Sequence, residues 1–290
     1  MSTVFATERR PTEHVTPAAF PELWAVRDEH LAQQLEGVIR QFRLEPAIRT
    51  GHLSISIVDI TNPQTPRYAG LNDEQMHYAA SLPKITILLA AFYRSETSGQ
   101  PMPQDIYDDA VKMIRYSNNA SATRVLAWVG NDFLVRMLQA DAFRLYDPNH
   151  NGGLWVGRGY AEGTEYQRDP LHNTSHGANT LQIARFWYLL ATDRLINPER
   201  SQEMKHLMGN PVFNNKFVRG LVNRPGLRIY RKTGTFKQYH GDGALIEIGS
   251  GRNLRRYIMA ALATDTDGGE WIRQLAAPLY DILSTNSKAE

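Results

Sequence analysis

Residues 85–92 constrain the fold of this chain more than any other stretch. They read Ile-Thr-Ile-Leu-Leu-Ala-Ala-Phe and carry no charge. Because apolar side chains occupy nearly every face of a helix with this sequence, the helix has to be buried on all sides. We therefore expect it to be the central helix of the fold. A chain of 290 residues with 42% hydrophobic content can bury a core of that size.

Helical and strand patterns occur in blocks along the rest of the chain. Helical patterns cover residues 24–42, 105–128, 132–138, 181–195 (with Thr180 as the expected cap) and 271–283. Strand patterns cover residues 53–60, 227–231, 244–248 and 257–262, with a glycine-rich hairpin turn at 249–253. This order predicts an α+β fold, in which N- and C-terminal helices flank an antiparallel sheet and a helical lobe is inserted between them.

We expect a single domain at residues 23–286, preceded by an N-terminal extension at residues 1–22. Its α/β lobe would use both chain ends, about 23–68 and 220–286, and its helical lobe about 69–219. A cleft between two lobes is a common place for a ligand site. The chemistry is expected there.

Composition argues against several classes of function. The 32 Lys and Arg residues nearly balance 30 Asp and Glu, and no long basic run indicates nucleic acid as a partner. There is no cysteine for a disulfide or a thiol nucleophile. No segment is apolar and long enough to span a membrane, and residues 1–21 lack the apolar core of a secretory signal. We expect a monomer that acts on a small molecule.

Three short motifs carry the chemistry. Ser81-Leu82-Pro83-Lys84 opens the apolar helix, Ser117-Asn118-Asn119 lies in a helical stretch, and Lys232-Thr233-Gly234 follows a strand. Each motif alone is a weak signal, because such short patterns also arise by chance. Their order and structural context make a joint hypothesis, since these elements can bring the three motifs together.

Ser81 and Lys84 suit a nucleophile and its base. A serine hydroxyl needs a base to take its proton as it attacks a carbonyl. Residues three apart on a helix share a face, and a lysine among apolar groups and other cations is driven towards its neutral form. The alternative is a capping serine followed by a solvated lysine, which the apolar surroundings of Lys84 disfavour.

The second motif offers groups that can act on the leaving group of an acyl-transfer reaction. The Ser117 hydroxyl can pass a proton to a leaving nitrogen, and the Asn119 amide can bind a substrate amide. The alternative is an ordinary helix start capped by Ser117.

The third motif suits an anionic substrate. Lys232, Thr233 and Thr235 offer a cation and two hydroxyls to a carboxylate, and Gly234 lets a substrate backbone approach the strand. Acyl transfer also needs two N–H groups aimed at the developing oxyanion, for which the backbones of Ser81 and Thr235 are the candidates. The alternative is an edge-strand lysine followed by a glycine turn.

With these motifs the chain resembles the serine β-lactamase and penicillin-binding-protein superfamily, above all the class A β-lactamases. The resemblance covers roughly residues 31–283 and includes 180–204, which is similar to the helix after the family's active-site loop. It implies a β-lactamase/transpeptidase-like fold without a cofactor. It also implies a periplasmic or secreted protein if a signal was removed, and otherwise a cytoplasmic one.

The resemblance assigns roles to the motif residues. Ser81 becomes the nucleophile, Lys84 the base, Ser117 the proton shuttle and Asn119 the contact to a substrate amide. Carboxylate recognition falls to Lys232, Thr233 and Thr235.

The chain departs from the family in three places. The first two motifs lie only 36 residues apart, so part of the helical lobe is missing. The long loop at 149–179 lacks the family's Glu-x-x-Leu-Asn pattern, which leaves Glu162 and Glu165 as possible deacylation bases. Gly241-Asp242-Gly243 stands where the family often carries an arginine, so carboxylate binding would depend on Arg219 or be weaker.

His172 and His176 have the spacing of two zinc ligands on a helix, but the residues between them favour a loop and no third ligand is evident. We therefore expect no metal site.

These residues predict a serine hydrolase that forms an acyl-enzyme at Ser81 and hydrolyses β-lactams. One alternative is a D-Ala-D-Ala carboxypeptidase or esterase with the same acylation machinery. Another is a β-lactam-binding sensor that deacylates slowly.

Overall fold

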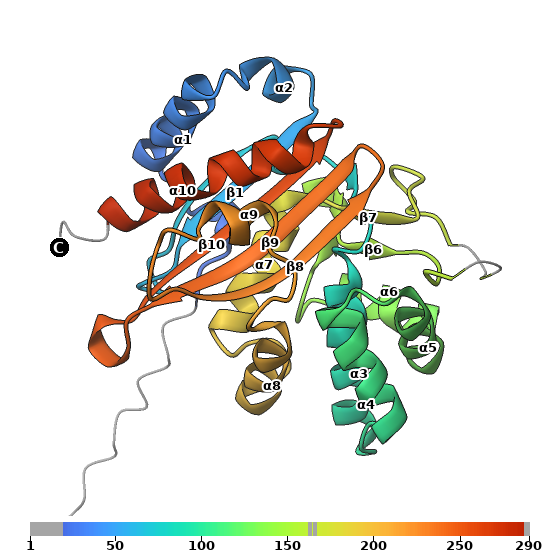
Figure 1. The fold of residues 1–290 in the computed structure, drawn as a ribbon. Coiled ribbons are helices and arrows are strands. Elements are labelled where there is room, and N and C mark those ends of the chain that lie inside the picture. Colours follow the sequence, from blue (N-terminus) through green and yellow to red (C-terminus); the bar gives the residue numbers. More distant parts are fainter. Residues whose placement is uncertain (1–19, 162–163, 165–166, 287–290) are drawn as a thin grey trace, which may run out of the picture.

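A five-stranded antiparallel sheet forms the middle of the molecule in the computed structural model, which describes residues 20–161, 164 and 167–286 (Figure 1). Its strands, in spatial order, are β2 (Arg67–Leu71), β1 (Leu53–Asp59), β10 (Arg255–Thr264), β9 (Tyr239–Ile248) and β8 (Arg228–Phe236). Alternate residues of a strand point to opposite faces, and both faces of this sheet are covered by helices. The predicted α+β fold is confirmed.

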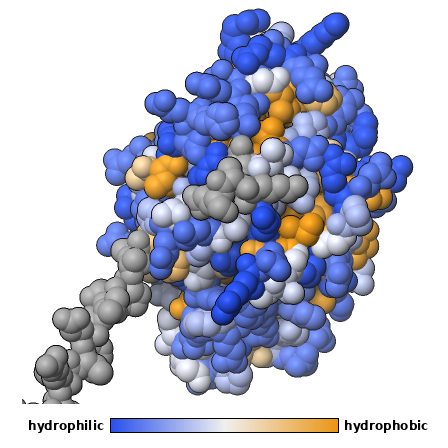
Figure 2. All heavy atoms as spheres, turned by 90° about the vertical axis from the view of Figure 1, so that its left-hand side faces the viewer, coloured by the Kyte–Doolittle hydropathy of each residue, from blue (hydrophilic) through white to orange (hydrophobic). Residues whose placement is uncertain are grey.

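The helices near the two chain ends cover one face of the sheet. They are α1 (Glu29–Gln41), α2 (Glu45–Arg49), α9 (Lys216–Gly220) and α10 (Gly268–Asn286). Leu31 and Leu35 of α1 and Leu275 of α10 are buried in one cluster with Ile55 and Ile57 of β1. The outer surface in Figure 2 is largely hydrophilic, with apolar side chains in small separate groups, because the apolar faces of these helices turn inward.

The helical lobe covers the other face. It contains α3 (Lys84–Ser98), α4 (Gln104–Arg115), α5 (Asn119–Val129), α6 (Asn131–Gln139), α7 (Thr180–Ala191) and α8 (Pro198–Met208). Every residue of α3 from Lys84 to Phe92 is buried, which confirms the predicted central helix. None of the helices within the described ranges has the length and apolar character to cross a bilayer.

Short strands and 3₁₀ turns complete the fold. They are β3 (His77–Tyr78), β6 (Trp155–Val156) and β7 (His176–Ala178) in one small sheet, β4 (Tyr146–Asp147) and β5 (Gly152–Gly153) in another, and the 3₁₀ turns η1 (Leu23–Ala25), η2 (Pro148–His150) and η3 (Gly251–Asn253). β7 pairs with both β3 and β6, so the loop that follows α6 is tied to the segment just before Ser81.

Several predicted boundaries were wrong. The first long helix begins at Glu29 rather than at residue 24, because Asp28 caps it by accepting a hydrogen bond from the Leu31 N–H at 2.8 Å. The expected helix over 105–128 is two helices, interrupted at Ser117, whose backbone is left-handed with φ of 55°. The β2 strand was missed, since its alternation is short and lies between turn residues.

Two further corrections concern caps and strand ends. Asn179, not Thr180, caps α7, because its side-chain oxygen accepts from the Gln182 N–H at 2.9 Å. The Lys232-Thr233-Gly234 motif lies inside β8 rather than after it, since β9 pairs with β8 as far as Phe236. The motif resembles a turn in sequence only because of its glycine.

Gly234 allows β8 to touch the turn before α3. A Cβ atom at this position would lie 2.2 Å from the Ala79 carbonyl oxygen and 2.8 Å from the Leu82 nitrogen. Both neighbours are backbone atoms that cannot move aside independently. Because residue 234 has no side chain, β8 can lie directly against the turn that carries Ser81. This requirement for glycine is separate from any contact with a substrate.

His77 makes the stability of the fold sensitive to acid. Its ring contacts Ser54 Oγ at 2.8 Å and Thr264 Oγ1 at 3.1 Å, and burial, with the nearby charge of His52, lowers its pKa to about 4. The folded state therefore binds fewer protons than the unfolded state. The stability that neutral His77 provides is full above about pH 6.5 and is lost as the pH falls towards 4.

We predict that the free energy of unfolding falls by roughly 2–3 kcal/mol through His77 alone between about pH 7 and pH 4.5. Urea unfolding followed by circular dichroism, compared between the wild type and His77→Gln, measures this contribution. The variant should lose less stability over that interval. Equal losses in the two proteins would show that His77 is not the group that titrates.

Candidate active site

The three motifs meet beside a cavity of about 300 Å³ at the N-terminal end of α3. Its lining residues come from both lobes and are Tyr78, Ala80, Ser81, Asn119, Arg158, Gly159, Tyr160, Ser175, His176, Thr235 and Phe236. A cavity of this volume has room for the reacting part of a small molecule.

Ser81 lies in a tight turn immediately before α3. The Leu82 N–H donates to the Ala79 carbonyl at 3.0 Å, and Ala80 has a left-handed backbone with φ of 49°. Ser81 therefore precedes the helix, and its carbonyl accepts from the Lys84 N–H at 3.3 Å. Within the described ranges no acceptor binds the Ser81 N–H, which leaves it available to a ligand oxygen at the cavity.

Lys84, the first residue of α3, is fully buried. Its Nζ donates to the Ser117 carbonyl and to Asn119 Oδ1, both at 2.7 Å, and lies 4.4 Å from the centre of the Tyr160 ring. Burial lowers the pKa of Lys84 to about 7, because an ammonium loses its hydration inside the protein. A substantial neutral fraction is therefore present near pH 7.

The contacts of Lys84 occupy both N–H groups of its neutral form. A neutral amine has two N–H groups, which the Ser117 carbonyl and Asn119 Oδ1 accept. The lone pair takes part in neither hydrogen bond and can accept a proton. The centre of the Tyr160 ring lies 4.4 Å from the nitrogen.

Ser117 joins two of the motif lysines. Its carbonyl binds Lys84, while its Oγ accepts from Lys232 Nζ at 3.0 Å, and Lys232 also donates to the Thr233 carbonyl at 2.9 Å. The left-handed backbone that presents both oxygens costs roughly 1–2 kcal/mol in a residue with a side chain. Burial and the neighbouring cations, Lys84 first among them, lower the pKa of Lys232 well below its ordinary value.

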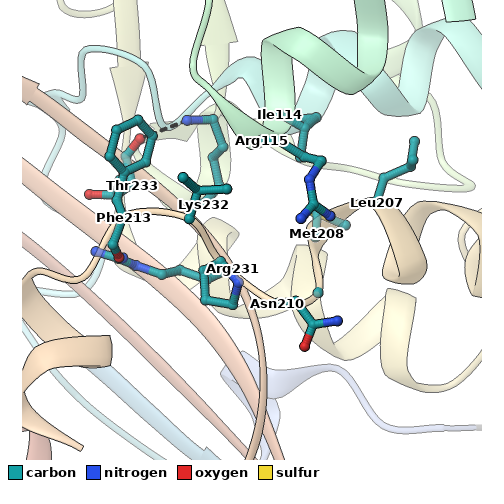
Figure 3. Close-up of a pocket in the computed structure, with 12 residues that line it drawn as sticks. Ile114, Arg115, Leu207, Met208, Asn210, Phe213, Arg231, Lys232 and Thr233 are labelled. Carbon is teal, nitrogen blue, oxygen red and sulfur yellow. Dashed lines mark hydrogen bonds between the residues drawn. The ribbon is translucent and has the colours of Figure 1, made fainter. Parts of the chain in front are cut away.

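The side chains of neighbouring residues in β8 lie on different faces of the sheet. Figure 3 shows the side chains of Lys232 and Arg231 leaving the strand in different directions, and in a strand successive side chains point to opposite faces. Arg231 forms a buried ion pair with Asp242 of β9, with N–O distances of 2.6 and 2.7 Å, and donates to the Phe213 carbonyl. The small cavity in Figure 3 has a volume of about 20 Å³, which is room for about one water.

Asp242 lies in the Gly241-Asp242-Gly243 stretch, and its charge is balanced by Arg231. The structure places Lys216 of α9, and not Arg219, against the hydroxyls of β8. Arg219 is exposed, whereas Lys216 is buried. Sequence reasoning missed Lys216, because nothing in the pattern around it indicates that α9 carries it under the sheet edge.

Lys216 fixes the direction of two hydroxyl groups. Its Nζ donates to Thr233 Oγ1 at 2.9 Å and to Thr235 Oγ1 at 2.8 Å, with the Gly234 and Gly241 carbonyls at 2.6 and 3.1 Å. An ammonium only donates, so both hydroxyls accept from it. The Thr233 hydroxyl donates a hydrogen bond to the Gly241 carbonyl. The exposed Thr235 hydroxyl can therefore donate to an incoming anion.

The loop at 149–179 contributes aromatic groups to the site. Tyr160 lies over Lys84, and the ring of His176 stacks on Tyr160 with centroids 4.1 Å apart. The possible deacylation bases Glu162 and Glu165 lie outside the described residues. Among the described cavity-lining residues there is no carboxylate.

His172 and His176 do not share a helix. His176 lies in β7, and His172 lies in the preceding loop, where its Nε2 contacts the Asn151 carbonyl at 3.1 Å. No cluster of three or more potential ligands occurs in the part of the chain that the structure describes.

The arrangement can therefore support acyl transfer. It combines a serine hydroxyl, a buried amine that is partly neutral at pH 7, a second serine whose carbonyl and hydroxyl each bind a lysine, and a strand edge suited to an anion.

Comparisons with known proteins agree with this geometry. Residues 104–283 match the Beta-lactamase2 family, described as the β-lactamase enzyme family. No curated protein matches the chain. The structure of PBP-A superposes with a TM-score of 0.65 at 18% identity, over 89% of this chain and 97% of that one.

Two bacterial β-lactamase structures superpose similarly, with TM-scores of 0.63 at 15% identity. The protein from Sphaerobacter thermophilus covers 88% of this chain and 95% of its own, and that from Xanthomonas campestris pv. campestris covers 88% and 98%. These likenesses establish a shared fold. The family match spans more than half the length of this chain. This chain therefore belongs to the β-lactamase enzyme family.

Proposed function

We propose that this protein is a serine hydrolase that forms an acyl-enzyme at Ser81 from a β-lactam or a related amide. The observation that carries the proposal is the position of Lys84, whose Nζ is bound by Ser117 and Asn119 beside Ser81. Lys232 binds the same Ser117 from the other side. Ser81, Asn119 and Thr235 line the same cavity, which supports a shared site for the three motifs.

In the proposed acylation, neutral Lys84 takes the proton of Ser81 Oγ as that oxygen bonds to the substrate carbonyl carbon. The N–H groups of Ser81 and Thr235 stabilise the oxyanion. When the carbon–nitrogen bond breaks, the Ser117 hydroxyl gives its proton to the leaving nitrogen, and the proton held by Lys84 replaces it. One proton thus passes overall from Ser81 to the leaving nitrogen.

The rest of the site would hold the substrate. Asn119, which forms part of the cavity lining, would bind the amide of the acyl group. Lys232 and the Thr235 hydroxyl would bind a substrate carboxylate, with Thr233 and Lys216 fixing the direction of that hydroxyl. Because charge-assisted hydrogen bonds are strong, this edge favours substrates with an anionic group.

Two fates of the acyl-enzyme follow from the proposal. Hydrolysis by water gives β-lactamase activity, for which Glu162 or Glu165 would have to act as the base. A slow second step would instead suit a D-Ala-D-Ala carboxypeptidase, an esterase or a β-lactam-binding sensor. The described lining of the cavity holds no carboxylate, and both candidate bases lie outside the described residues, so the measured lifetime of the adduct has to distinguish the two fates.

We predict that benzylpenicillin adds its full mass to the wild-type protein, since opening the ring expels no fragment. Intact-protein mass spectrometry followed over time measures both formation and loss of the adduct. Ser81→Ala should form none. An adduct of equal yield on Ser81→Ala, or no adduct and no turnover of any β-lactam by the wild type, would refute acylation at Ser81.

The acylation rate should rise with pH through about 7, because only neutral Lys84 can take the proton of Ser81. Between about pH 6 and pH 8 the neutral fraction, and with it the rate, should increase roughly tenfold. Stopped-flow acylation by a chromogenic β-lactam measures this profile. Lys84→Arg, which keeps the charge at every accessible pH, should be nearly inactive, and a flat profile in the wild type would rule out Lys84 as the base.

Lys216 should matter for substrates that carry a carboxylate. We predict that Lys216→Met slows acylation by benzylpenicillin about 10- to 100-fold, and acylation by its methyl ester much less. Arg219→Met on the same helix is the matched control and should leave both rates near the wild-type values. Equal losses for acid and ester, in a variant whose melting temperature shows it to be folded, would show that Lys216 supports the fold alone.

A further inference from the structure

We propose that Tyr160 keeps the Ser81 acyl-enzyme long-lived, because its ring occupies the space beside Lys84 in which a hydrolytic water would have to lie. The inference rests on the proposed acylation at Ser81. It makes Tyr160 a positioning residue, which acts through Lys84 and through the exclusion of water.

The ring of Tyr160 is held on several sides. Its face covers Lys84 Nζ at 4.4 Å, and the His176 ring stacks on it at 4.1 Å with an angle of 36° between the planes. The hydroxyl donates to the Ala80 carbonyl at 3.2 Å. The backbone N–H groups of Tyr160 and Ala161 both donate to Thr123 Oγ1 of α5 at 2.9 Å. The ring therefore cannot move aside easily.

This placement matters for the second chemical step. A water oxygen has to bond to the acyl carbon while the bond from that carbon to Ser81 Oγ breaks. One proton of the water must go to a base, and Oγ must receive a proton in return. Lys84 is the nearest base, but its nitrogen is enclosed by the Ser117 carbonyl, Asn119 Oδ1 and the Tyr160 ring. The Tyr160 ring thus takes up space beside this nitrogen that a water would need.

The other described groups at the cavity are poor substitutes. The His176 ring nitrogens contact Ser175 Oγ and the Arg158 carbonyl, both at 3.1 Å, and burial lowers its pKa to about 4, so it is a weak base. Burial raises the pKa of Tyr160 well above its ordinary value, so its hydroxyl stays protonated. Water that enters the described part of the cavity therefore meets no base except the covered Lys84.

The test compares Tyr160→Ala, which opens the space, with Tyr160→Phe, which keeps the ring. Each protein is acylated briefly with benzylpenicillin, the free drug is removed, and the adduct is followed by intact-protein mass spectrometry. We expect the adduct on Tyr160→Ala to have a half-life at least about tenfold shorter than that of the wild type, because water now reaches Lys84. Tyr160→Phe should restore a long half-life.

A second pair of variants tests the same idea if Tyr160→Ala does not fold. Thr123→Val removes the acceptor that holds the Tyr160 backbone, whereas Thr123→Ser keeps it. The adduct should decay faster on Thr123→Val than on Thr123→Ser. Melting temperatures identify variants that are merely unfolded.

Several results would overturn the inference. One is a wild-type adduct that decays within seconds, and another is a half-life that does not change when the ring is removed. A third is a marked lengthening in Glu162→Gln or Glu165→Gln, since a carboxylate would then already activate the water. If the wild type forms no adduct at all, the proposed function fails as well, whereas the other results leave acylation at Ser81 intact.

Discussion

The site depends on one buried amine. Lys84 enters the core at the first turn of an apolar helix, and the lost hydration is offset by two short hydrogen bonds to Ser117 and Asn119. These bonds explain why Ser117 accepts a left-handed backbone, which presents one oxygen to Lys84 and another to Lys232. The helical lobe and the sheet edge are therefore joined through a single serine between two lysines.

The sheet edge adds further cations, and the nearby carboxylate of Asp242 is buried in an ion pair. Lys216 and Lys232 are both buried at β8, and the carboxylate of Asp242 is neutralised by Arg231 on the face of the sheet that carries Lys216. A site with this charge attracts anions, and a bound carboxylate would favour the protonated form of Lys232. The lowered pKa of Lys84 has a different cause, which is the burial of its amine at the start of α3.

The sequence alone predicted those features of the fold and the site that depend on local sequence patterns. The apolar run at 85–92 predicted a central helix because no face of it could be solvated, and three spaced motifs predicted which side chains would meet. Contacts made in three dimensions were not predictable. Lys216 comes under β8 only through the packing of α9, and Tyr160 reaches Lys84 only because Thr123 and β7 fix its loop. Gly234 could be recognised as a position of close approach, but not the turn that approaches it.

The central claim is that Lys84 has a lowered pKa, so that a substantial fraction of its amine is neutral at pH 7. The most direct test is an NMR titration of the Lys84 side chain in protein labelled with ¹³C at the lysine ε-carbons, with Lys84→Arg used to assign the signal. The structure predicts a pKa of about 7, clearly below that of the exposed lysines. A pKa near 10.5, the ordinary value for lysine, would contradict the claim, because Lys84 would then be an ammonium that cannot take the proton of Ser81.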